Sequence, residues 1–508
     1  MPATRPRHRP SPELSRRSFL IAAGGAGAAA VLAGCGSATE GALPGSRVGP
    51  GSPQVLQAEL ARRGAGQRTV DVALDAVTGP VDIGARTVAT WSYGGEVPGT
   101  EIRVRRGDLL RAQVSNHLPA PTTVHWHGVA LRNDMDGVPV LTQPEIAPGA
   151  AMRYAFTVPD PGTYWLHPHV GTQLDRGLQA PLIIEDPADG AGYDQELVVV
   201  FDDWLDGTGR TPDQVLTDLR AHGMGGGMGG SGGMAMAQSA LLGGDAGDVT
   251  YPFYLANGRT PDAARTFAAK PGQRIRLRMI NAGGDTAFRV GVPGSGMTIT
   301  HTDGFPVTPT QAQAVLLGMG ERVDAVITMP ATAVPLLGLA EGKNGTAALL
   351  LQPGHGPAPD TAVAATALMS QPVTMPNNLR GTAALTLPTR SPDVVADMKL
   401  AGPGNGYTWT INDQTYDPNR GVPVHEGQRV RLRFINTTTM FHPMHLHGHT
   451  FQIHTPNGPG PRKDTAIVRP SQTLEVDFDA DNPGQWLTHC HNIYHGEAGM
   501  MTVISYLQ

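Results

Sequence analysis

Three segments of the chain share one alternation of apolar and polar residues. In each of them a glycine precedes an asparagine by nine residues, and the apolar positions between the two alternate with polar ones. A period of two predicts a β-strand with one buried face. The segments are RGDLLRAQVSN at 106–116, PGQRIRLRMIN at 271–281 and EGQRVRLRFIN at 426–436. We therefore expect an internal repeat built on strands.

The second and third copies of the repeat extend beyond the strand. Asn257-Gly258 precedes the second copy by about the same interval as Asn412-Asp413 precedes the third. The copies lie about 160 residues apart, which is the size of a domain. A chain of 508 residues also has room for about three domains. The sequence predicts an all-β protein of three tandem β-sandwich domains, placed at 66–190, 195–355 and 395–508.

Three other segments lack the strand pattern. Residues 36–65 are rich in Gly, Ala, Ser and Pro without periodicity, which predicts a flexible tether. Residues 222–236, HGMGGGMGGSGGMAM, cannot pack a core and are expected to form a loop of the second domain. Residues 356–394 are rich in Pro, Ala and Thr and are interpreted as a linker to the third domain.

The first 35 residues are typical of a signal peptide. SRRSFL at 15–20 has the twin-arginine pattern, and the apolar run that follows is too short for a confident membrane span. Leu32-Ala33-Gly34-Cys35 then resembles a lipobox, in which the cysteine is lipidated; the alternative is an ordinary cleavage site with an incidental cysteine. We expect export to the cell envelope, with a lipid anchor on the outer face of the cytoplasmic membrane, or secretion.

Net charge and cysteine content indicate which partners to expect and what Cys490 does. The formal net charge is -6, with 16% charged residues and no long basic run, so nucleic acid is not an expected partner. The chain has two cysteines, and if Cys35 is consumed by processing, Cys490 has no disulfide partner. Metal ligation is the best explanation for an exported lone thiol, because a coordinated thiolate is held and protected.

Ten of the eighteen histidines lie in four tight clusters. Several are spaced at i and i+2, which on a strand places both rings on the same face. One strand can therefore supply two ligands to one site. The clustered residues are His125 and His127; His167 and His169; His442, His445 and His447; and His489, His491 and His495.

Cys490 stands between His489 and His491, so strand alternation points it to the opposite face. If Cys490 binds one metal and its neighbours bind others, the backbone forms a short bridge between two sites. His442, Cys490, His495 and a weak axial Met500 match the ligand set of a blue-copper centre. The other eight histidines suffice for a cluster of several metals. Zinc is the main rival, but structural zinc sites favour paired cysteines and need four ligands.

The order HWHG, HPH, HPMHLHGH and HCHNIYHGEAGM resembles the three-domain multicopper oxidases, which include laccases, bilirubin oxidases and cuprous oxidases. The chain is also similar to mycobacterial-type copper-resistance oxidases, which are exported lipoproteins. This resemblance implies three cupredoxin-like Greek-key domains and four copper ions, with a trinuclear cluster between the first and third domains. Its implied ligands are His442, Cys490, His495 and Met500 for type 1; His125 and His445 for type 2; and His127, His167, His169, His447, His489 and His491 for the type 3 pair.

The activity that the resemblance implies is four one-electron oxidations, electron transfer through Cys490 to His489 and His491, and reduction of dioxygen to two waters. Asp136 matches the acid of the family near the cluster; a turn-forming aspartate is the alternative. The second acid of the cuprous-oxidase pattern usually follows the last type 1 histidine, where this chain has Gly496. Glu497, one place later, is the remaining candidate for proton delivery.

Methionines favour cuprous ion as the substrate. Met440 lies where cuprous oxidases place a thioether. Residues 222–236, the Gly/Met segment, offer further soft ligands, namely Met224, Met228, Met234 and Met236. The alternatives are a packed core residue for Met440 and a loop without ligands for the segment. We expect oxidation of cuprous ion in copper detoxification, with phenols or ferrous ion as possible additional reductants. The competing hypotheses are a laccase-like phenol oxidase and a metal-free cupredoxin scaffold.

Overall fold

The computed structural model describes residues 37–38, 41–43, 45–186, 192–223, 237–354, 357, 359–456 and 458–508. Residues Ser37–Gln508 form one compact unit. The predicted signal peptide with Cys35, the four methionines between 224 and 236, and His355 lie outside the described residues. Within the described ranges, no helix combines the length and apolar composition that a bilayer-spanning segment needs.

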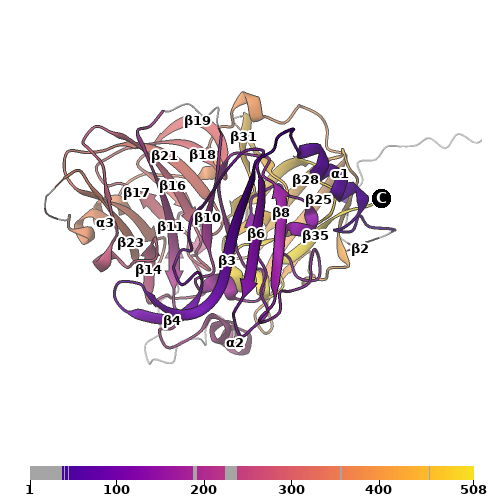
Figure 1. The fold of residues 1–508 in the computed structure, drawn as a ribbon, viewed down its shortest axis with the longest axis horizontal. Helices are drawn as coiled ribbons and strands as arrows, with labels where there is room; N and C mark the ends of the chain where they lie inside the picture. The colour runs from indigo at the N-terminus through magenta and orange to yellow at the C-terminus, as the bar shows by residue number, and fades with distance from the viewer. Residues whose placement is uncertain are drawn as a thin grey trace, which may run out of the picture. The chain divides into compact units, whose positions relative to one another are not determined.

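Two four-stranded sheets make up the first part of the unit, and Figure 1 shows β3, β6 and β8 side by side. Apolar residues of both sheets, such as Val114 and Leu182, share one core, as expected for a sandwich. In the order of their strands, the sheets are β4 (Thr87–Tyr93), β3 (Thr69–Asp82), β6 (Leu109–Asn116) and β8 (Ala151–Thr157), and β5 (Ile102–Arg105), β10 (Ala180–Glu185), β9 (Gly162–His167) and β7 (His125–His127).

Two six-stranded sheets follow, with a short pair formed by β12 (Gln238–Ser239) and β13 (Gly244–Asp245). The first sheet is β14 (Phe253–Ala256), β11 (Gln195–Trp204), β16 (Arg274–Asn281), β21 (Arg322–Thr328), β18 (Met297–Thr302) and β19 (Phe305–Ala312). The second is β15 (Thr266–Ala268), β23 (Thr346–Gln352), β22 (Val334–Ala340), β17 (Phe288–Gly291), β20 (Ala314–Leu317) and β24 (Val373–Thr374).

The third pair of sheets and the segments that adjoin its strands carry six of the ten clustered histidines. One sheet is β1 (Ser37–Ala38), β25 (Val394–Gly404), β28 (Arg429–Asn436), β33 (Thr473–Asp479), β30 (Phe451–Thr455) and β31 (Gly458–Lys463), with β26 (Thr408–Ile411) on β25. The other is β2 (Gly41–Ala42), β27 (Arg420–Val424), β35 (Met501–Tyr506), β34 (Gln485–Cys490), β29 (His442–Leu446) and β32 (Thr465–Val468). The prediction of an all-β protein with three sandwiches is thus confirmed, while the predicted domain limits stay a prediction.

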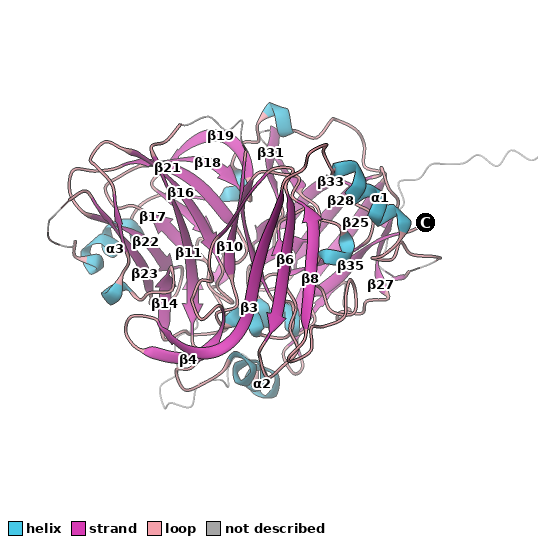
Figure 2. Cartoon of the chain, in the orientation of Figure 1, coloured by secondary structure: helices cyan, strands magenta, loops and turns pink. Residues whose placement is uncertain are grey.

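Helices are few and short, as Figure 2 shows. The α-helices are α1 (Pro53–Arg62), α2 (Pro212–His222), α3 (Thr361–Met369) and α4 (Ile493–Glu497). The 3-10 helices are η1 (Asn133–Met135), η2 (Gln173–Asp175), η3 (Pro261–Ala263), η4 (Pro376–Asn378) and η5 (Ala383–Leu385).

Two segments without a strand pattern are more ordered than the sequence predicts. The prediction of a flexible tether at 36–65 is wrong for α1, where Glu59 Oε1 accepts hydrogen bonds from Thr157 N at 3.0 Å and Thr157 Oγ1 at 2.8 Å. These tertiary contacts stabilise a helix that is too short to form alone. The predicted linker, 356–394, contains α3, and its β24 pairs with β20.

The internal repeat is confirmed in atomic detail by the three asparagines that end β6, β16 and β28. Each Nδ2 donates to two backbone carbonyls, and each Oδ1 accepts from the backbone N–H two residues later. Asn257 and Asn412 also repeat one pattern, since each side chain bonds the backbone of the preceding long strand. The amides of Asn281 and Asn436 also join the two sheets of their sandwiches, because Leu317 lies in β20 and Val468 lies in β32.

We predict that Asn281→Ala lowers the free energy of unfolding of the metal-free protein by about 3 kcal/mol, because three buried backbone groups lose their partner. Those groups are Thr286 O, Leu317 O and Gly283 N, each 2.9 Å from the amide. Urea denaturation measures the effect. Asn405→Ala, at an exposed loop position, is the matched control, and equal effects of the two changes would contradict this role for the amide.

Candidate metal centres

His442, Cys490 and His495 form the first group of side chains that could hold a metal ion, called the Cys490 group below. The Nδ1 atoms of His442 and His495 lie 3.1 Å apart, and Sγ of Cys490 lies 3.5 Å and 3.6 Å from them. All three residues are buried. Their outer nitrogens are held, because His442 Nε2 lies 2.9 Å from Thr438 Oγ1 and His495 Nε2 lies 2.9 Å from Asp248 Oδ2. The inner atoms are therefore directed at one common point.

The loop after β34 sets the spacing of this group. Asn492 caps α4 by accepting hydrogen bonds from the backbone of Tyr494 and His495. The Cys490 N–H donates to Met500 O and the Met500 N–H donates to His495 O, both at 3.0 Å. Met500 is fully buried in the same apolar cluster as Cys490. The structure thus brings together all four residues predicted for the blue-copper centre.

Strand register brings the other eight histidines together in one place, called the eight-histidine cluster below. β7 and β9 are antiparallel, with His125 opposite His167, and β29 and β34 are antiparallel, with His445 opposite His489. Trp126, which lies between two of the histidines, belongs instead to the core of the first sandwich. The predicted alternation of side chains along the strand is therefore confirmed here. The ligand atoms gather in three groups, which are His125, His127 and His445; His127, His167 and His491; and His169, His447 and His489.

Several nitrogens in these groups fit a bound metal because they are buried without a protein partner. Among the described residues, His125 Nε2, His445 Nε2, His169 Nε2 and both ring nitrogens of His491 make no hydrogen bond. Burial lowers the pKa of His445 and holds the pKa of His491 well below its usual range, so both rings are neutral and can offer a lone pair. Buried polar atoms without partners are costly, and a coordinated cation would satisfy them.

Asp136 is the acid that the sequence predicts beside the cluster, and the structure places it there. It is fully buried, and its Oδ2 lies 3.0 Å from His447 Nδ1 while its backbone oxygen lies 2.8 Å from His125 Nδ1. Such outer contacts orient metal-binding rings. The neighbouring Asp134 instead forms an ion pair with Arg132 at 2.6 Å.

Glu497 lies in a different environment from the one predicted for it. Burial raises the pKa of its carboxyl to about 7, and the charges that act on it belong to Arg220 and Asp213 of α2 rather than to a cluster histidine. Gly496, by contrast, faces the cluster, since a Cβ atom at this residue would lie 3.9 Å from His489 Nδ1. An acid at residue 496 would therefore reach the histidines, and at residue 497 it points toward α2.

The sequence does not reveal Asp464, which supplies a second carboxylate at the eight-histidine cluster. Its Oδ1 lies 3.2 Å from His127 Nε2, and its backbone oxygen lies 2.9 Å from His445 Nδ1. The guanidinium of Arg322 donates to both carboxylate oxygens, at 2.7 Å and 2.6 Å, and both side chains have no exposed surface. This ion pair holds the pKa of Asp464 well below its usual range. Neither Asp464 nor Arg322 stands at a characteristic sequence distance from a histidine, so no sequence pattern identifies them as site residues.

The backbone after the Gly/Met segment lies against the loop before His442. Asp245 of β13 forms a bridge with Met440, and its N–H donates to Thr439 O at 3.3 Å. Met440 is buried. Burial raises the pKa of Asp245 to about 6, and nearby Asp248 adds to this effect. The structure therefore places Asp248 against the Cys490 group and pairs the backbone of Asp245 with that of Met440, whereas Met224, Met228, Met234 and Met236 lie outside the described residues.

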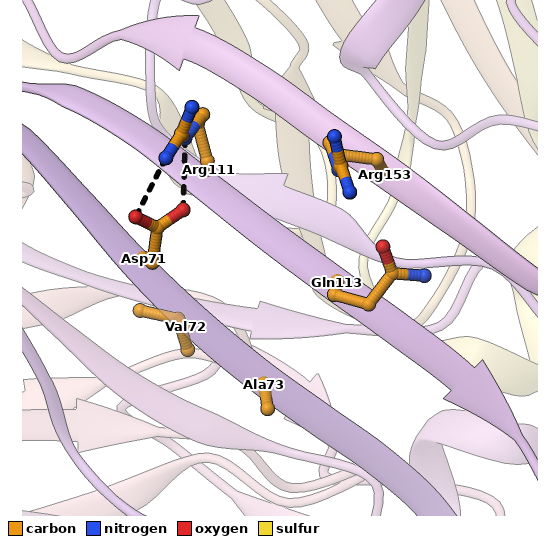
Figure 3. Close-up of a pocket in the computed structure, with 6 residues that line it drawn as sticks. All are labelled: Asp71, Val72, Ala73, Arg111, Gln113 and Arg153. Atoms are coloured by element: carbon orange, nitrogen blue, oxygen red, sulfur yellow. Dashed lines mark hydrogen bonds and ion pairs between the residues drawn. The ribbon is translucent and has the colours of Figure 1, made fainter.

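A hollow of about 410 Å³ lies on the outer face of β3, β6 and β8 (Figure 3). Its lining includes no residue of the metal groups, and two of its charged residues, Asp71 and Arg111, bind each other at 2.7 Å and 2.8 Å. It gives no support for a second functional site.

Comparison with known proteins places these groups in context. Sequence models described as multicopper oxidase match residues 77–189, 196–335 and 389–507. The chain is 46% identical to multicopper oxidase MmcO of Mycobacterium tuberculosis over 509 residues, which covers 97% of each chain. It is 29% identical to a copper resistance protein A homolog of Pseudomonas syringae, covering 96% of this chain and 98% of the relative.

Solved structures agree on the fold. A multicopper oxidase from Pseudomonas thermotolerans superposes with a TM-score of 0.64 and 26% identity, covering 87% of this chain and 100% of that chain. The multicopper oxidase Fet3p superposes with a TM-score of 0.70 and 20% identity, covering 86% and 90%. The three sandwiches are therefore cupredoxin-like domains. The three matched segments and the relative at 46% identity show that the chain belongs to the multicopper oxidase family of copper-dependent oxidoreductases.

Proposed function

We propose that the chain oxidises cuprous ion at the Cys490 group and reduces dioxygen at the eight-histidine cluster. The observation that carries this proposal is the segment His489-Cys490-His491 at the end of β34, whose middle side chain belongs to one metal group and whose outer side chains belong to the other. Four cuprous ions, one dioxygen and four protons balance to four cupric ions and two waters. Because each cuprous ion gives one electron, the chain must connect single-electron donors to a four-electron acceptor.

The proposed metal complement is four copper ions. His442, Cys490, His495 and Met500 would hold type 1 copper; His125 and His445 would hold type 2; and His127, His167, His169, His447, His489 and His491 would hold the type 3 pair. Copper bound at these residues supplies one-electron redox chemistry. The unpaired nitrogens of His125, His445 and His491 support this assignment, since each is buried and directed into a group.

Proton supply is assigned to Asp136. Its Oδ2 lies 3.0 Å from His447 Nδ1 and its Oδ1 lies 3.2 Å from His125 Nδ1, so the carboxylate contacts two rings of the cluster and can pass a proton there. Glu497 is less suited to this step because the charges around it belong to α2. We assign Glu497 to the side of the Cys490 group, where a carboxyl of pKa about 7 can take a proton from a phenolic reductant.

The substrate proposal rests on the groups beside His495. Asp248 contacts His495 Nε2, and the backbone of Asp245 pairs with that of Met440, two residues before His442, so carboxylate and thioether residues are close to the Cys490 group in the fold. Soft thioethers select cuprous ion. Relatives named copper resistance protein agree with this choice. The proposal also assigns cuprous binding to Met224, Met228, Met234 and Met236.

A laccase-like phenol oxidase is the second candidate, favoured by relatives named laccase, one of them 27% identical to this chain. A metal-free scaffold is the third; it would lack ligands, yet every predicted metal-binding side chain is present. If copper-loaded protein showed no blue absorption, the scaffold would be preferred.

We infer that the chain is exported by the twin-arginine route and is held at the membrane by a lipid on Cys35. The support is the sequence SRRSFL followed by LAGC. Cys35→Ser is expected to move the protein from the membrane fraction to the soluble fraction without changing its copper content. Membrane association that survives the substitution would contradict the lipid anchor.

We predict that Asp136→Asn slows re-oxidation of the reduced protein by dioxygen about 100-fold, as expected for loss of a proton donor. Anaerobic bleaching of the blue absorption by the reductant should stay unchanged, and stopped-flow absorption separates the two steps. Asp134→Asn is the matched control, because Asp134 is paired with Arg132. An equal effect of the two substitutions would remove Asp136 from proton supply.

Deletion of residues 222–236 tests the substrate. We expect the oxygen consumption of copper-loaded protein with cuprous ion to fall about tenfold, equivalent to about 1.4 kcal/mol, and the rate with a phenol to change little. The phenol serves as the internal control for an intact electron path. Unchanged turnover of cuprous ion would exclude the segment from substrate binding, and faster turnover of phenol than of cuprous ion in the intact protein would favour the laccase-like candidate.

A further inference from the structure

A turn of the second sandwich lies against the histidine cluster although it carries no metal-binding side chain. This turn comprises residues 318–322, just before and at the start of β21. Gly320 has φ +84°, and a Cβ atom built on it would lie 2.8 Å from Cδ2 and 3.0 Å from Cγ of His491, and 3.0 Å from Cε1 of His127. Real Cβ atoms essentially never approach within 3.0 Å of another heavy atom. The backbone of Gly320 therefore contacts both rings directly.

His491 is the ring that depends most on such a contact. Neither of its nitrogens has a hydrogen-bond partner among the described residues, whereas His127, His445 and His447 each contact a carboxylate or backbone oxygen. Metal-binding histidines usually use that second nitrogen to fix the ring plane. In His491 the plane is set by packing, with His127 at 4.9 Å and Trp165 at 5.6 Å between ring centroids.

The turn is itself held firmly. The Gly320 N–H donates to Asn281 O at 2.9 Å, and Arg322 Nη1 donates to Gly320 O at 3.0 Å. The Gly318 N–H donates to Glu321 Oε2 at 2.7 Å. Arg322 is in turn clamped by Asp464. A buried turn held by these hydrogen bonds moves little, so its backbone can act as a fixed surface for the rings.

We propose that Gly320 is a positioning residue for the cluster, and that its backbone fixes the ring plane of His491, and secondarily of His127, by van der Waals contact. Glycine is required for two separate reasons, namely the left-handed φ and the absence of room for a Cβ atom. The role in metal binding rests on the proposed function, whereas the contact itself does not. A domain that supplies no ligand to the eight-histidine cluster thereby helps to determine the geometry of that cluster.

The first experiment compares Gly320→Ala with Gly272→Ala. Gly272 has φ +82°, but a Cβ atom there meets nothing within 4 Å, so the control carries the same backbone strain without the ring contact. Gly320→Ala should weaken copper binding at the eight-histidine cluster about 10- to 100-fold and lower the copper count per chain, while the blue absorption of the Cys490 group persists. A full copper count, or an equal loss in Gly272→Ala, would overturn the proposal.

A second experiment needs no copper and so separates this inference from the proposed function. The urea midpoints of the metal-free wild type, Gly320→Ala, His491→Ala and the double variant form a double-mutant cycle. Gly320→Ala should lower the midpoint less in the His491→Ala background, because removal of the ring makes room for the Cβ atom. Additive effects would show that Gly320 and the ring do not interact and would overturn the proposal even if the wild type binds four coppers.

Discussion

The opposite directions of neighbouring side chains along a β-strand are the constraint on which the metal centres depend. At His489-Cys490-His491, this alternation sends the thiol to one group and both imidazoles to the other. Side chains of the two groups therefore come from adjacent residues of the backbone. The register of β29 with β34 fixes which residues face each other, with Met444 opposite Cys490 and His445 opposite His489. A shift of one residue would exchange the two faces and dismantle both groups.

Burial gives these groups their chemistry. It raises the pKa of the Cys490 thiol and lowers that of most cluster histidines, so without a cation the thiol is protonated and the rings are neutral. Copper binding would therefore displace a proton from Cys490 and satisfy nitrogens such as His491 Nε2 that have no protein partner. The site favours a metal because the folded protein buries these ring nitrogens without a hydrogen-bond partner among the described residues.

The second sandwich contributes no predicted ligand to the Cys490 group or to the eight-histidine cluster, yet it supports both. Arg322 holds Asp464, which contacts His127 and His445, and Asp248 holds the outer nitrogen of His495. A buried ion pair such as Arg322 with Asp464 repays its desolvation only when its geometry and its remaining hydrogen bonds are satisfied, as they are here. The interfaces between the sandwiches are therefore part of the metal centres.

The sequence by itself determined the all-β class, the three-fold repeat and the candidate metal-binding side chains, because a period of two and the i, i+2 spacing are local properties of a strand. It did not predict α1, whose order depends on Thr157, or the direction of Glu497. Only the tertiary structure revealed Asp464, Asp248 and Gly320. These residues reach the histidines from strands and turns far away in the chain, and contacts of that kind are set by sheet register and by packing between domains, which no local pattern encodes.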